Sequence, residues 1–370
     1  MERILEPEFL HSLLSRIRAL PYKLQISYRR LLASRHLRHY QSLNRQSSDR
    51  MDLSKLLRPR HDEIKKLAKA CYQQMGVYPI SYGIPDQHLQ RGLDSGKTKL
   101  FSDIIPGLPY SFDSETEYLN EYRQSYFALT MKKAGWDALR NLEIVSQGAL
   151  PVFSKARRIP KFTMIHWPKD LLILLETAYK KPNLEPFSEE TLDSLGEYVR
   201  NHLTSEAMVR YLLEMSEYSK LGRILFLDEY IKENQDYHSI FTVLGLQKIY
   251  PERVDILYPP EYLYTSYKRD SSKLYGLGFS YAKRLDRDYE LDSRSAHVPH
   301  ETFLETNSSD YDLIVVGSYR ENPRIVKSII KLGLQEKTIF IYGHDLPPTR
   351  GELRDIRRHK LTVFAREIYG

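Results

Sequence analysis

Cysteine is almost absent from this chain, and its scarcity excludes two kinds of structure. Cys71 is the single cysteine among 370 residues. One cysteine cannot form a disulfide within the chain, and it cannot supply the thiolate ligands of a cysteine-built metal site. Because 41% of the residues are hydrophobic and 28% are charged, we expect a soluble globular protein from a reducing compartment.

Long apolar runs are also missing. No segment approaches the roughly 18 uninterrupted apolar residues that a membrane-spanning helix needs, and the first residues lack the apolar core of a signal peptide. We therefore expect a cytoplasmic protein. Common phosphate-binding and metal-binding motifs are absent as well, because the chain has neither a Walker lysine motif nor a HisGluXxxXxxHis spacing.

Positive charge is concentrated near the N-terminus. The net charge is +7, and residues 1–60 carry thirteen Lys and Arg residues against five Asp and Glu residues. Apolar residues recur there at helical spacing and are interrupted at Pro21, which predicts two basic amphipathic helices. Such helices could dock peripherally on an anionic inner membrane face, or they could pack on the core with a solvated basic face. We do not expect nucleic acid as a partner, because no nucleic-acid motif accompanies the charge.

Residues 125–153 predict a strand, a turn, a helix and a second strand. The first residues are apolar and β-prone, and the LysLysAlaGlyTrpAsp segment then breaks that pattern with Gly135 and with Asp137, a favoured helix N-cap residue. The helix is predicted to end at Gly148, ahead of a buried strand at residues 150–153.

The start of this predicted helix is a candidate anion site. A helix N-terminus offers backbone N–H groups and the positive end of its dipole, and Lys132 and Lys133 add positive charge beside it. Arg140 and Glu143 are three residues apart and share one helix face, where a guanidinium can bind phosphate and a carboxylate can accept ribose hydrogen bonds. The alternative is an ordinary surface ion pair on a helix that connects two strands.

The second half of the chain predicts a parallel sheet. Five buried strands, at residues 223–228, 254–258, 311–317, 337–343 and 361–365, alternate with helical segments. In such sheets ligands bind at the carboxyl ends of the strands. The residues at those ends are Asp228, Gly317, Ser318, Gly343, His344 and Asp345.

The first half resembles a known family. A serine, a phenylalanine, a basic pair and a glycine, followed by Arg140, Glu143, a second glycine and ProValPhe, form a pattern similar to the nucleotide-sugar-binding half of exostosin-like glycosyltransferases of the GT-B type. The chain resembles more closely a group of microbial and viral glycosyltransferase-like proteins that carry LysLysAlaGlyTrpAsp, Arg, Glu and a GlyXxxXxxPro segment in this order. In that group IleSerXxxXxxIlePro and LysXxxLys segments come earlier and ThrMet and TrpProLys segments come later, as residues 80–85, 97–99, 163–164 and 167–169 do here.

The second half resembles the partner domain of the same group. That domain carries an AspTyr loop, a TyrGlyXxxGlyPhe segment, a TyrAspLeuIle strand, an IlePheIleXxxGlyXxxAsp strand and a closing PheXxxArgGlu, found here at residues 236–237, 275–279, 311–314, 339–345 and 364–367. In the group this domain precedes the nucleotide-sugar domain, whereas here it follows. A circular permutation would explain the reversed order, and it would place residues 367–370 close to residues 76–82.

The resemblance implies an α/β protein with two Rossmann-like domains in a GT-B-like arrangement. We divide the chain into a basic helical extension at 1–65, a nucleotide-sugar domain with linking helices at 66–218, and a second, acceptor domain at 219–370. The implied activity transfers a sugar from a nucleoside diphosphate sugar to a glycan or lipid-linked acceptor. The alternatives are a catalytically silent binding or scaffold module, and a basic membrane or nucleic-acid adaptor.

The resemblance also implies roles for single residues. Arg140 would contact the diphosphate and Glu143 the ribose, with donor-binding support from Ser81, Tyr82, Lys132, Lys133, Gly135 and Asp137. A general base would come from the second domain, where the candidates are Asp236, His238, Asp345 and Asp228. We expect no metal ion and no cofactor, because the cations and the helix N-terminus could neutralise the departing diphosphate.

Three further motifs are weak signals. The acidic triplets at 286–288 and 310–312 match the metal-binding triplet of GT-A glycosyltransferases, but neither ends a strand, so we expect both to be structural. The TyrGlyLeuGlyPhe segment at 275–279 has two glycines at dinucleotide-binding spacing, without a preceding strand or a third glycine.

Overall fold

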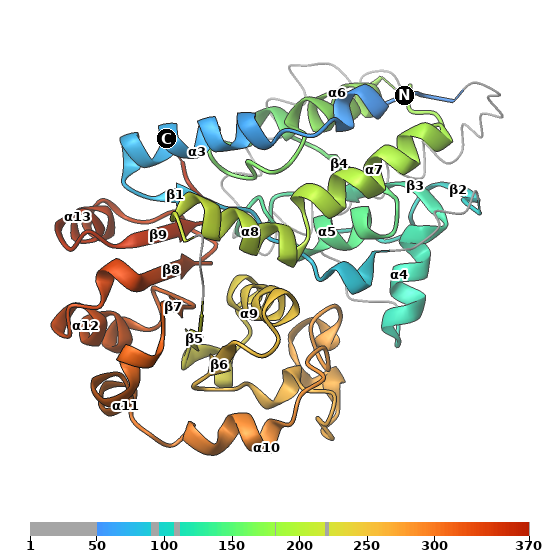
Figure 1. The fold of residues 1–370 in the computed structure, drawn as a ribbon. Helices are drawn as coiled ribbons and strands as arrows, with labels where there is room; N and C mark the ends of the chain where they lie inside the picture. Colours follow the sequence, from blue (N-terminus) through green and yellow to red (C-terminus); the bar gives the residue numbers. More distant parts are fainter. Residues whose placement is uncertain (1–49, 90–95, 107–111, 182, 219–221, 370) are drawn as a thin grey trace, which may run out of the picture.

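The computed structural model describes residues 50–89, 96–106, 112–181, 183–218 and 222–369. The two basic helices predicted near the N-terminus lie outside the described residues. Helices and parallel strands alternate along the described chain, so the predicted α/β class is confirmed (Figure 1). The strands form a six-stranded and a three-stranded parallel sheet, which are compatible with Rossmann-like folds.

The larger sheet has the strand order β1-β9-β8-β7-β5-β6, and every neighbouring pair is parallel. Its strands are β1 (Tyr78–Pro79), β5 (Ile224–Leu227), β6 (Val254–Ile256), β7 (Leu313–Val316), β8 (Thr338–Tyr342) and β9 (Thr362–Ala365). All five strands predicted in the second half are present, and β1 is added from the first half. The strand order changes direction between β5 and β7, since β6 lies on one side of β5 and β7 on the other.

Helices cover both faces of this sheet (Figure 1). One face is covered by α8 (Ser205–Met215) and α9 (Tyr237–Ile249), the other by α11 (His300–Asn307), α12 (Pro323–Lys331) and α13 (Arg350–Arg358), while α3 (His61–Met75) packs beside the edge strand β1. Phe226 of β5 packs toward α8 and α9, whereas the adjacent Leu227 packs toward the other helices. This alternation is expected of a strand that is buried on both faces.

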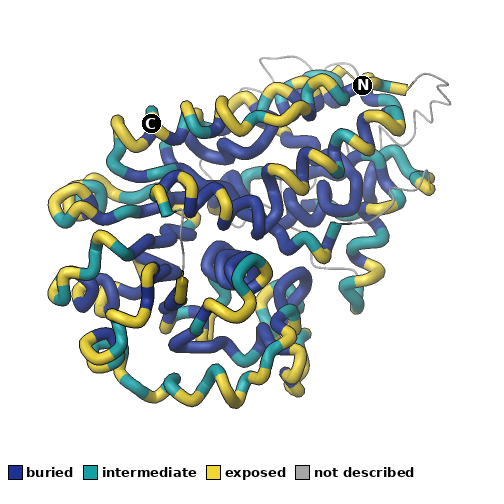
Figure 2. Tube along the Cα trace, in the orientation of Figure 1, coloured by how far each residue is buried: buried dark blue, intermediate teal, exposed yellow. Residues whose placement is uncertain are grey.

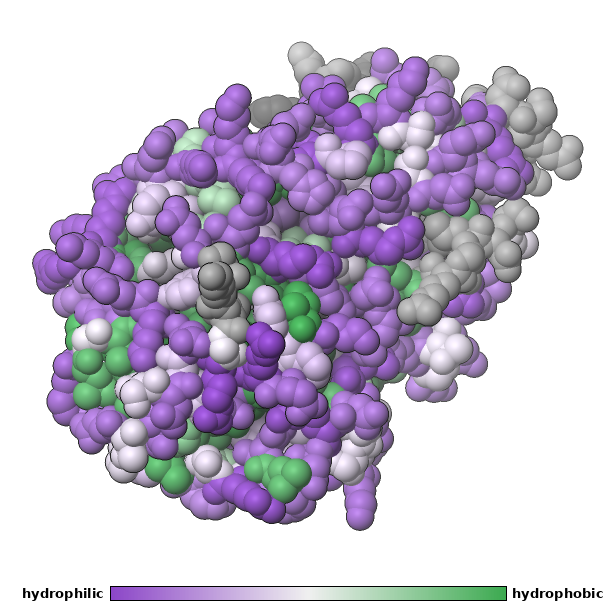
Figure 3. All heavy atoms as spheres, viewed as in Figure 1, coloured by the Kyte–Doolittle hydropathy of each residue, from purple (hydrophilic) through white to green (hydrophobic). Residues whose placement is uncertain are grey.

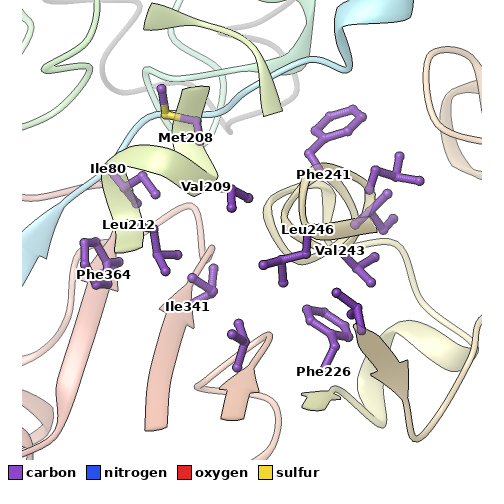
Figure 4. Packing of buried hydrophobic residues seen from close by; sticks show 14 of the residues in the cluster. Ile80, Met208, Val209, Leu212, Phe226, Phe241, Val243, Leu246, Ile341 and Phe364 are labelled. Carbon is purple, nitrogen blue, oxygen red and sulfur yellow. The ribbon is translucent and has the colours of Figure 1, made fainter. Parts of the chain in front are cut away.

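The core beneath α8 and α9 is continuous across the sheet. Figure 4 shows Ile341 and Phe364 of the sheet close to Leu212 on α8, and Phe226 below Leu246 on α9. The side chains of this cluster are apolar and almost fully buried. Their removal from water is a main contribution to holding the two helices on the sheet.

The smaller sheet has the order β2-β3-β4 and carries the predicted strand, helix and strand unit. Its strands are β2 (Lys99–Phe101), β3 (Ser125–Thr130) and β4 (Leu150–Phe153). The crossover helix between β3 and β4 is α5 (Leu139–Ser146), and Gly148 follows it with φ 73°, which a glycine adopts without strain. The helices α4 (Glu115–Arg123), α6 (Lys169–Lys180) and α7 (Glu189–His202) pack around this sheet.

Two elements of the first half lie with the larger sheet. Tyr78 and Pro79 of β1 pair with Phe364 and Ala365 of β9, and α8, which the sequence suggests as a linking helix, packs on α9. The boundary between the sheets therefore does not coincide with the predicted boundary at residue 219. The backbone N–H of Ile80 also donates to the carbonyl of Ala365 at 3.0 Å, so β9 lies beside residues 78–80.

Burial follows this arrangement (Figure 2). The strands of the larger sheet and most of α9 are buried, whereas α10 (Tyr289–Asp292), in the connection between β6 and β7, has no buried residue. Hydrophilic residues cover most of the face shown in Figure 3, and hydrophobic residues form small separate groups. Among the described residues, no helix combines the length and the apolar character that crossing a membrane would require.

Candidate functional site

A cavity of about 710 Å³ lies between the two sheets, at the carboxyl ends of their strands. The loops that follow β1, β3, β5, β7 and β8 contribute to its lining, and so does the first turn of α5. The strand order changes direction between β5 and β7, and parallel sheets usually bind ligands at such a point. The position of this cavity therefore makes it the candidate functional site.

Eight of the predicted site residues line this cavity. They are Tyr82, Lys133, Gly135, Asp137, Arg140, Glu143, Asp236 and Asp345. Six of them come from the first half of the chain and two from the second half. The structure thus brings donor-binding candidates and base candidates together around one space.

Four other predicted residues are not among the lining residues: Ser81, Lys132, His238, and Asp228, which is described below. The Oγ of Ser81 is buried and accepts a hydrogen bond from the backbone N–H of His166 at 3.3 Å. The ammonium of Lys132 lies 5.0 Å from the ring centroid of Tyr369, which is a cation–π contact. The ring of His238 is buried, and its centroid lies 5.3 Å from that of the Tyr82 ring. Ser81 and His238 are thus buried in the interior, and Lys132 packs on Tyr369 outside the lining.

No side chain among the described residues caps the start of the helix α5. Its N-cap residue is Ala138, so the prediction of Asp137 as the N-cap was wrong. The carboxylate of Asp137 instead accepts a hydrogen bond from the backbone N–H of Tyr82, at 2.7 Å from Oδ2. Within the described part of the chain no side chain caps α5, and Ala138 and Leu139 help to line the cavity, so an anion bound there would face the start of this helix.

The C-terminal strand holds the turn before α5. The Oε1 of Glu367 accepts hydrogen bonds from the backbone N–H groups of Trp136, at 2.7 Å, and Asp137, at 2.9 Å. The guanidinium of Arg366 donates to the carbonyl oxygens of Asp137 and Gly343 and pairs with the carboxylate of Asp345. Arg366 and Glu367 are both buried. This pair therefore fixes the positions of loops from both halves.

Gly135 in this turn has no room for a side chain. A Cβ atom there would lie 2.7 Å from Oε1 of Glu367 and 2.8 Å from Nη1 of Arg366. Both distances are shorter than the contacts that Cβ atoms make with oxygen or nitrogen atoms in folded proteins. The glycine of LysLysAlaGlyTrpAsp is therefore required by the close approach of the C-terminal strand.

Asp228 holds together the loops that follow β5 and β7. Its carboxylate accepts hydrogen bonds from the hydroxyls of Ser239 and Ser318, from the side-chain amide of Asn322 and from the backbone N–H of Tyr230. Burial raises its pKa to about 6, and these donors oppose that rise because they favour the charged form. Asp228 is not among the lining residues, so its position suits a supporting role.

Asp236 caps the helix that covers the larger sheet. Its Oδ1 accepts hydrogen bonds from the backbone N–H groups of His238, at 2.9 Å, and Ser239, at 3.2 Å. Burial raises the pKa of this carboxyl group. The N-terminus of α9 is therefore already occupied by a carboxylate, unlike the N-terminus of α5.

Glu143 is held by contacts from two other elements. Its carboxylate accepts hydrogen bonds from the hydroxyls of Tyr118, at 2.7 Å, and Ser280, at 2.9 Å. Burial raises its pKa, and nearby Arg140 favours the charged form. Glu143 borders the cavity, but these two hydroxyls already occupy part of its accepting capacity.

Sequence reasoning gave no role to several residues that line the cavity. Glu321 follows the end of β7 by five positions, and its place at the carboxyl end of a strand could have drawn attention to it. Tyr275 is 65% exposed and lies in a loop whose next residues, Gly276 and Leu277, have φ values of 62° and 60°. No dinucleotide fingerprint forms there. The loop presents Tyr275 at the cavity beside Tyr237, with the ring centroids 6.1 Å apart.

The acidic triplets have local structural contacts. Asp288 caps α10 by accepting from the backbone N–H of Glu290, and Oδ2 of Asp312 accepts from the backbone N–H of Gly222 at 2.6 Å. Within the described part of the chain, no group of three or more His, Cys, Asp and Glu side chains is arranged to hold a metal ion. That the function needs no metal stays a prediction.

Comparison of the chain with known protein families, with curated proteins and with solved structures found no match. A functional assignment therefore has to rest on the residues and the geometry of the cavity.

Proposed function

We propose that the protein is a GT-B-like glycosyltransferase, which transfers a sugar from a nucleoside diphosphate sugar to a glycan or lipid-linked acceptor. One observation carries this proposal. A single cavity combines the uncapped N-terminus of α5, Arg140 and Lys133 with the carboxyl groups that follow β5, β7 and β8. The cationic side suits a diphosphate, and the acidic side suits sugar hydroxyls and proton transfer.

The diphosphate is expected at the start of α5. Backbone N–H groups and the positive end of the helix dipole favour an anion there, and the guanidinium of Arg140 can bind two phosphate oxygens. Asp236 occupies the start of α9, so an anion is disfavoured at that end of the cavity. These cations and dipoles would stabilise the negative charge on the leaving diphosphate, which is why the proposed reaction needs no metal ion.

The acidic residues of the lining do not prevent anion binding. Five carboxyl groups line the cavity, from Asp137, Glu143, Asp236, Glu321 and Asp345. Burial raises the pKa of Asp137 to about 7 and that of Glu321 to about 7, and it also raises the pKa values of Glu143 and Asp236. The negative charge of Asp137 and Glu321 is therefore partly suppressed near neutral pH, and protonated carboxyl groups can donate hydrogen bonds.

The size and aromatic content of the cavity also suit a nucleotide sugar. Its volume of about 710 Å³ lies within the roughly 300 to 1,000 Å³ typical of small-molecule sites. Tyr82, Tyr237 and Tyr275 line it, and aromatic rings offer flat apolar surfaces to bases and sugars. The open face of Tyr275 is the most accessible of these.

The pairing of β1 with β9 supports a circular permutation, in which the two domains keep their contacts but follow each other in the reverse order along the chain. Residues 364–367 end the chain, yet they contact both β1 and the turn before α5. In the microbial and viral glycosyltransferase-like proteins that the chain resembles, the corresponding segment leads through a short connection into the IleSerXxxXxxIlePro segment. The contacts between the two halves are thus those expected if only the position of the chain break has moved.

A thermal-shift screen with uridine, guanosine and thymidine diphosphates and their sugar conjugates would test the proposed function. A ligand that binds only the folded state raises the melting temperature by mass action. At a free ligand concentration one hundred times Kd, it adds about 2.7 kcal/mol to the free energy of unfolding. We expect one nucleotide series to stabilise the protein, in EDTA as well as in buffer. Absence of any shift would contradict the proposal. Stabilisation by a nucleotide sugar without turnover would favour the binding or scaffold module instead.

A further inference from the structure

We propose that Glu321 is the general base that accepts the proton of the acceptor hydroxyl, an inference that rests on the glycosyltransferase function proposed above. Glu321 lies in the loop between β7 and α12 and lines the cavity. This loop belongs to the larger sheet, whereas α5 and its cations belong to the smaller one. The base would thus come from the half that does not hold the diphosphate.

The loop around Glu321 is anchored on both sides. Ser318 precedes it and Asn322 follows it, and both donate side-chain hydrogen bonds to the carboxylate of Asp228 at 2.7 Å. The backbone N–H of Glu321 donates to the carbonyl of Ser318 at 2.9 Å. A catalytic side chain has to be held in place by its supporting residues, and Asp228 supplies that support here.

The other two second-half carboxylates that line the cavity, those of Asp236 and Asp345, are engaged by protein donors. Asp236 accepts from two backbone N–H groups and lies 3.3 Å from the hydroxyl of Ser318. Asp345 pairs with the buried guanidinium of Arg366. By contrast, Oε2 of Glu321 is buried and has no hydrogen-bond partner among the described residues. Because no protein donor holds this oxygen, rotation of the Glu321 side chain can bring its carboxylate to a ligand hydroxyl in the cavity that the residue lines.

The charges that face Glu321 set its proton affinity. Burial, Asp236 and Asp228 raise its pKa to about 7, and Arg320 opposes this rise. The other titratable groups around the same cavity are Tyr82, Lys133, Asp137, Arg140, Glu143, Tyr230, Tyr237, Tyr275, His344 and Asp345. A base is most effective when its pKa lies near the working pH. His238 is less suited, because burial and Arg366 lower its pKa to about 3.

The proposed step balances without any other reactant. The acceptor oxygen forms a bond to the anomeric carbon of the donor sugar while the bond from that carbon to the phosphate oxygen breaks. The hydroxyl proton passes to the carboxylate of Glu321. The electron pair of the broken bond leaves with the nucleoside diphosphate, beside Arg140 and the start of α5.

The test replaces Glu321 by glutamine and compares two nucleophiles. For each of UDP-glucose, GDP-mannose and dTDP-glucose, release of the nucleoside diphosphate is measured with water and with sodium azide as the acceptor. Azide has no proton to lose, so it needs no base. We expect Glu321→Gln to lower turnover with water by about 10²- to 10⁴-fold and to leave turnover with azide within about threefold of wild type. The Kd for the nucleoside diphosphate should not change.

Glu233→Gln is the matched control, because Glu233 is exposed and does not line the cavity. It should leave both rates unchanged. If Glu321→Gln loses turnover equally with water and with azide, or loses none with either, Glu321 is not the general base. Turnover by the wild-type protein would still support the proposed function in that case. A wild-type protein that binds none of the nucleotides would contradict the function itself, and the role of Glu321 with it.

A second variant tests the same role through pH dependence. Asp236→Asn keeps a good helix cap and removes the neighbouring charge that raises the pKa of Glu321. The rising limb of the pH profile for turnover with water should therefore move to lower pH in Asp236→Asn and should disappear in Glu321→Gln. If the rising limb is unchanged in both variants, another group causes it and the proposal is wrong.

Discussion

Glu367 accepts hydrogen bonds through one carboxylate oxygen from the backbone N–H groups of Trp136 and Asp137, at 2.7 and 2.9 Å. The partners are more than two hundred positions apart in the chain. This contact joins the last strand of the larger sheet to the turn that opens α5. The candidate diphosphate site therefore depends on residues at the C-terminal end of the described chain.

Gly135→Ala should destabilise the protein. The added methyl group would meet Glu367 at 2.7 Å and Arg366 at 2.8 Å, and neither buried side chain can move away without losing its hydrogen bonds. Overpacking of this kind costs about 1–3 kcal/mol. Urea unfolding measures the loss. Gly351→Ala in α13 is the control, because its nearest neighbouring atom would be 3.8 Å away, and equal stability of the two variants would contradict the prediction.

Arg140→Ala should weaken nucleotide binding without unfolding the protein. Hydrogen bonds to charged groups contribute about 1.5–3 kcal/mol, so Kd for the stabilising nucleoside diphosphate should rise by roughly 10- to 150-fold. Isothermal titration calorimetry measures this change. The exposed Arg158 provides a control as Arg158→Ala, which should bind normally. If a folded Arg140→Ala protein binds the nucleoside diphosphate with unchanged affinity, the diphosphate does not bind at the start of α5.

Asp228→Ala should be strongly destabilising. It would leave the buried side-chain donors of Ser239, Ser318 and Asn322 without their acceptor, and each unsatisfied buried group costs about 1–3 kcal/mol. The midpoint of urea unfolding should therefore fall well below that of Asp310→Ala, which removes an exposed carboxylate. If the two variants unfold at the same urea concentration, the Asp228 contacts do not organise these loops.

His202 should make stability depend on pH. Burial, His61 and Arg60 lower the pKa of His202 to about 4, from an ordinary value near 6.5. The unfolded chain therefore binds a proton that the folded protein does not, and the contribution of His202 is complete above pH 6.5 and is lost as the pH falls toward 4. The slope is about 1.4 kcal/mol per pH unit for one group.

The measurement is urea unfolding of wild type and His202→Gln at pH 7.5 and pH 5. Carboxyl groups with raised pKa values, such as Asp137, change stability in the opposite direction over this range. They are common to both proteins, so the difference between the two isolates His202. We expect wild type to lose more stability than the variant on acidification. Equal losses would show that His202 is protonated in the folded state or is not buried.

The sequence predicted the local elements well because they depend on local patterns. Buried strands such as residues 313–316 and 338–342 were visible as short apolar runs between helical segments. Gly148 marked the end of α5 because a glycine tolerates a positive φ. The rule that ligands bind at the carboxyl ends of parallel strands also placed Asp345 at the cavity correctly.

Tertiary structure decided which of these elements meet and which side chains remain accessible. Asp137 is a good N-cap residue by type, yet its carboxylate binds the backbone of Tyr82 because folding brings β1 beside the turn. His238 and Asp236 are two positions apart, but only Asp236 lines the cavity, since the helix turns His238 into the core. Glu321 became a candidate only when its neighbours were known. Hydrogen-bond partners and burial are set by contacts between distant residues, and no local pattern of the chain contains them.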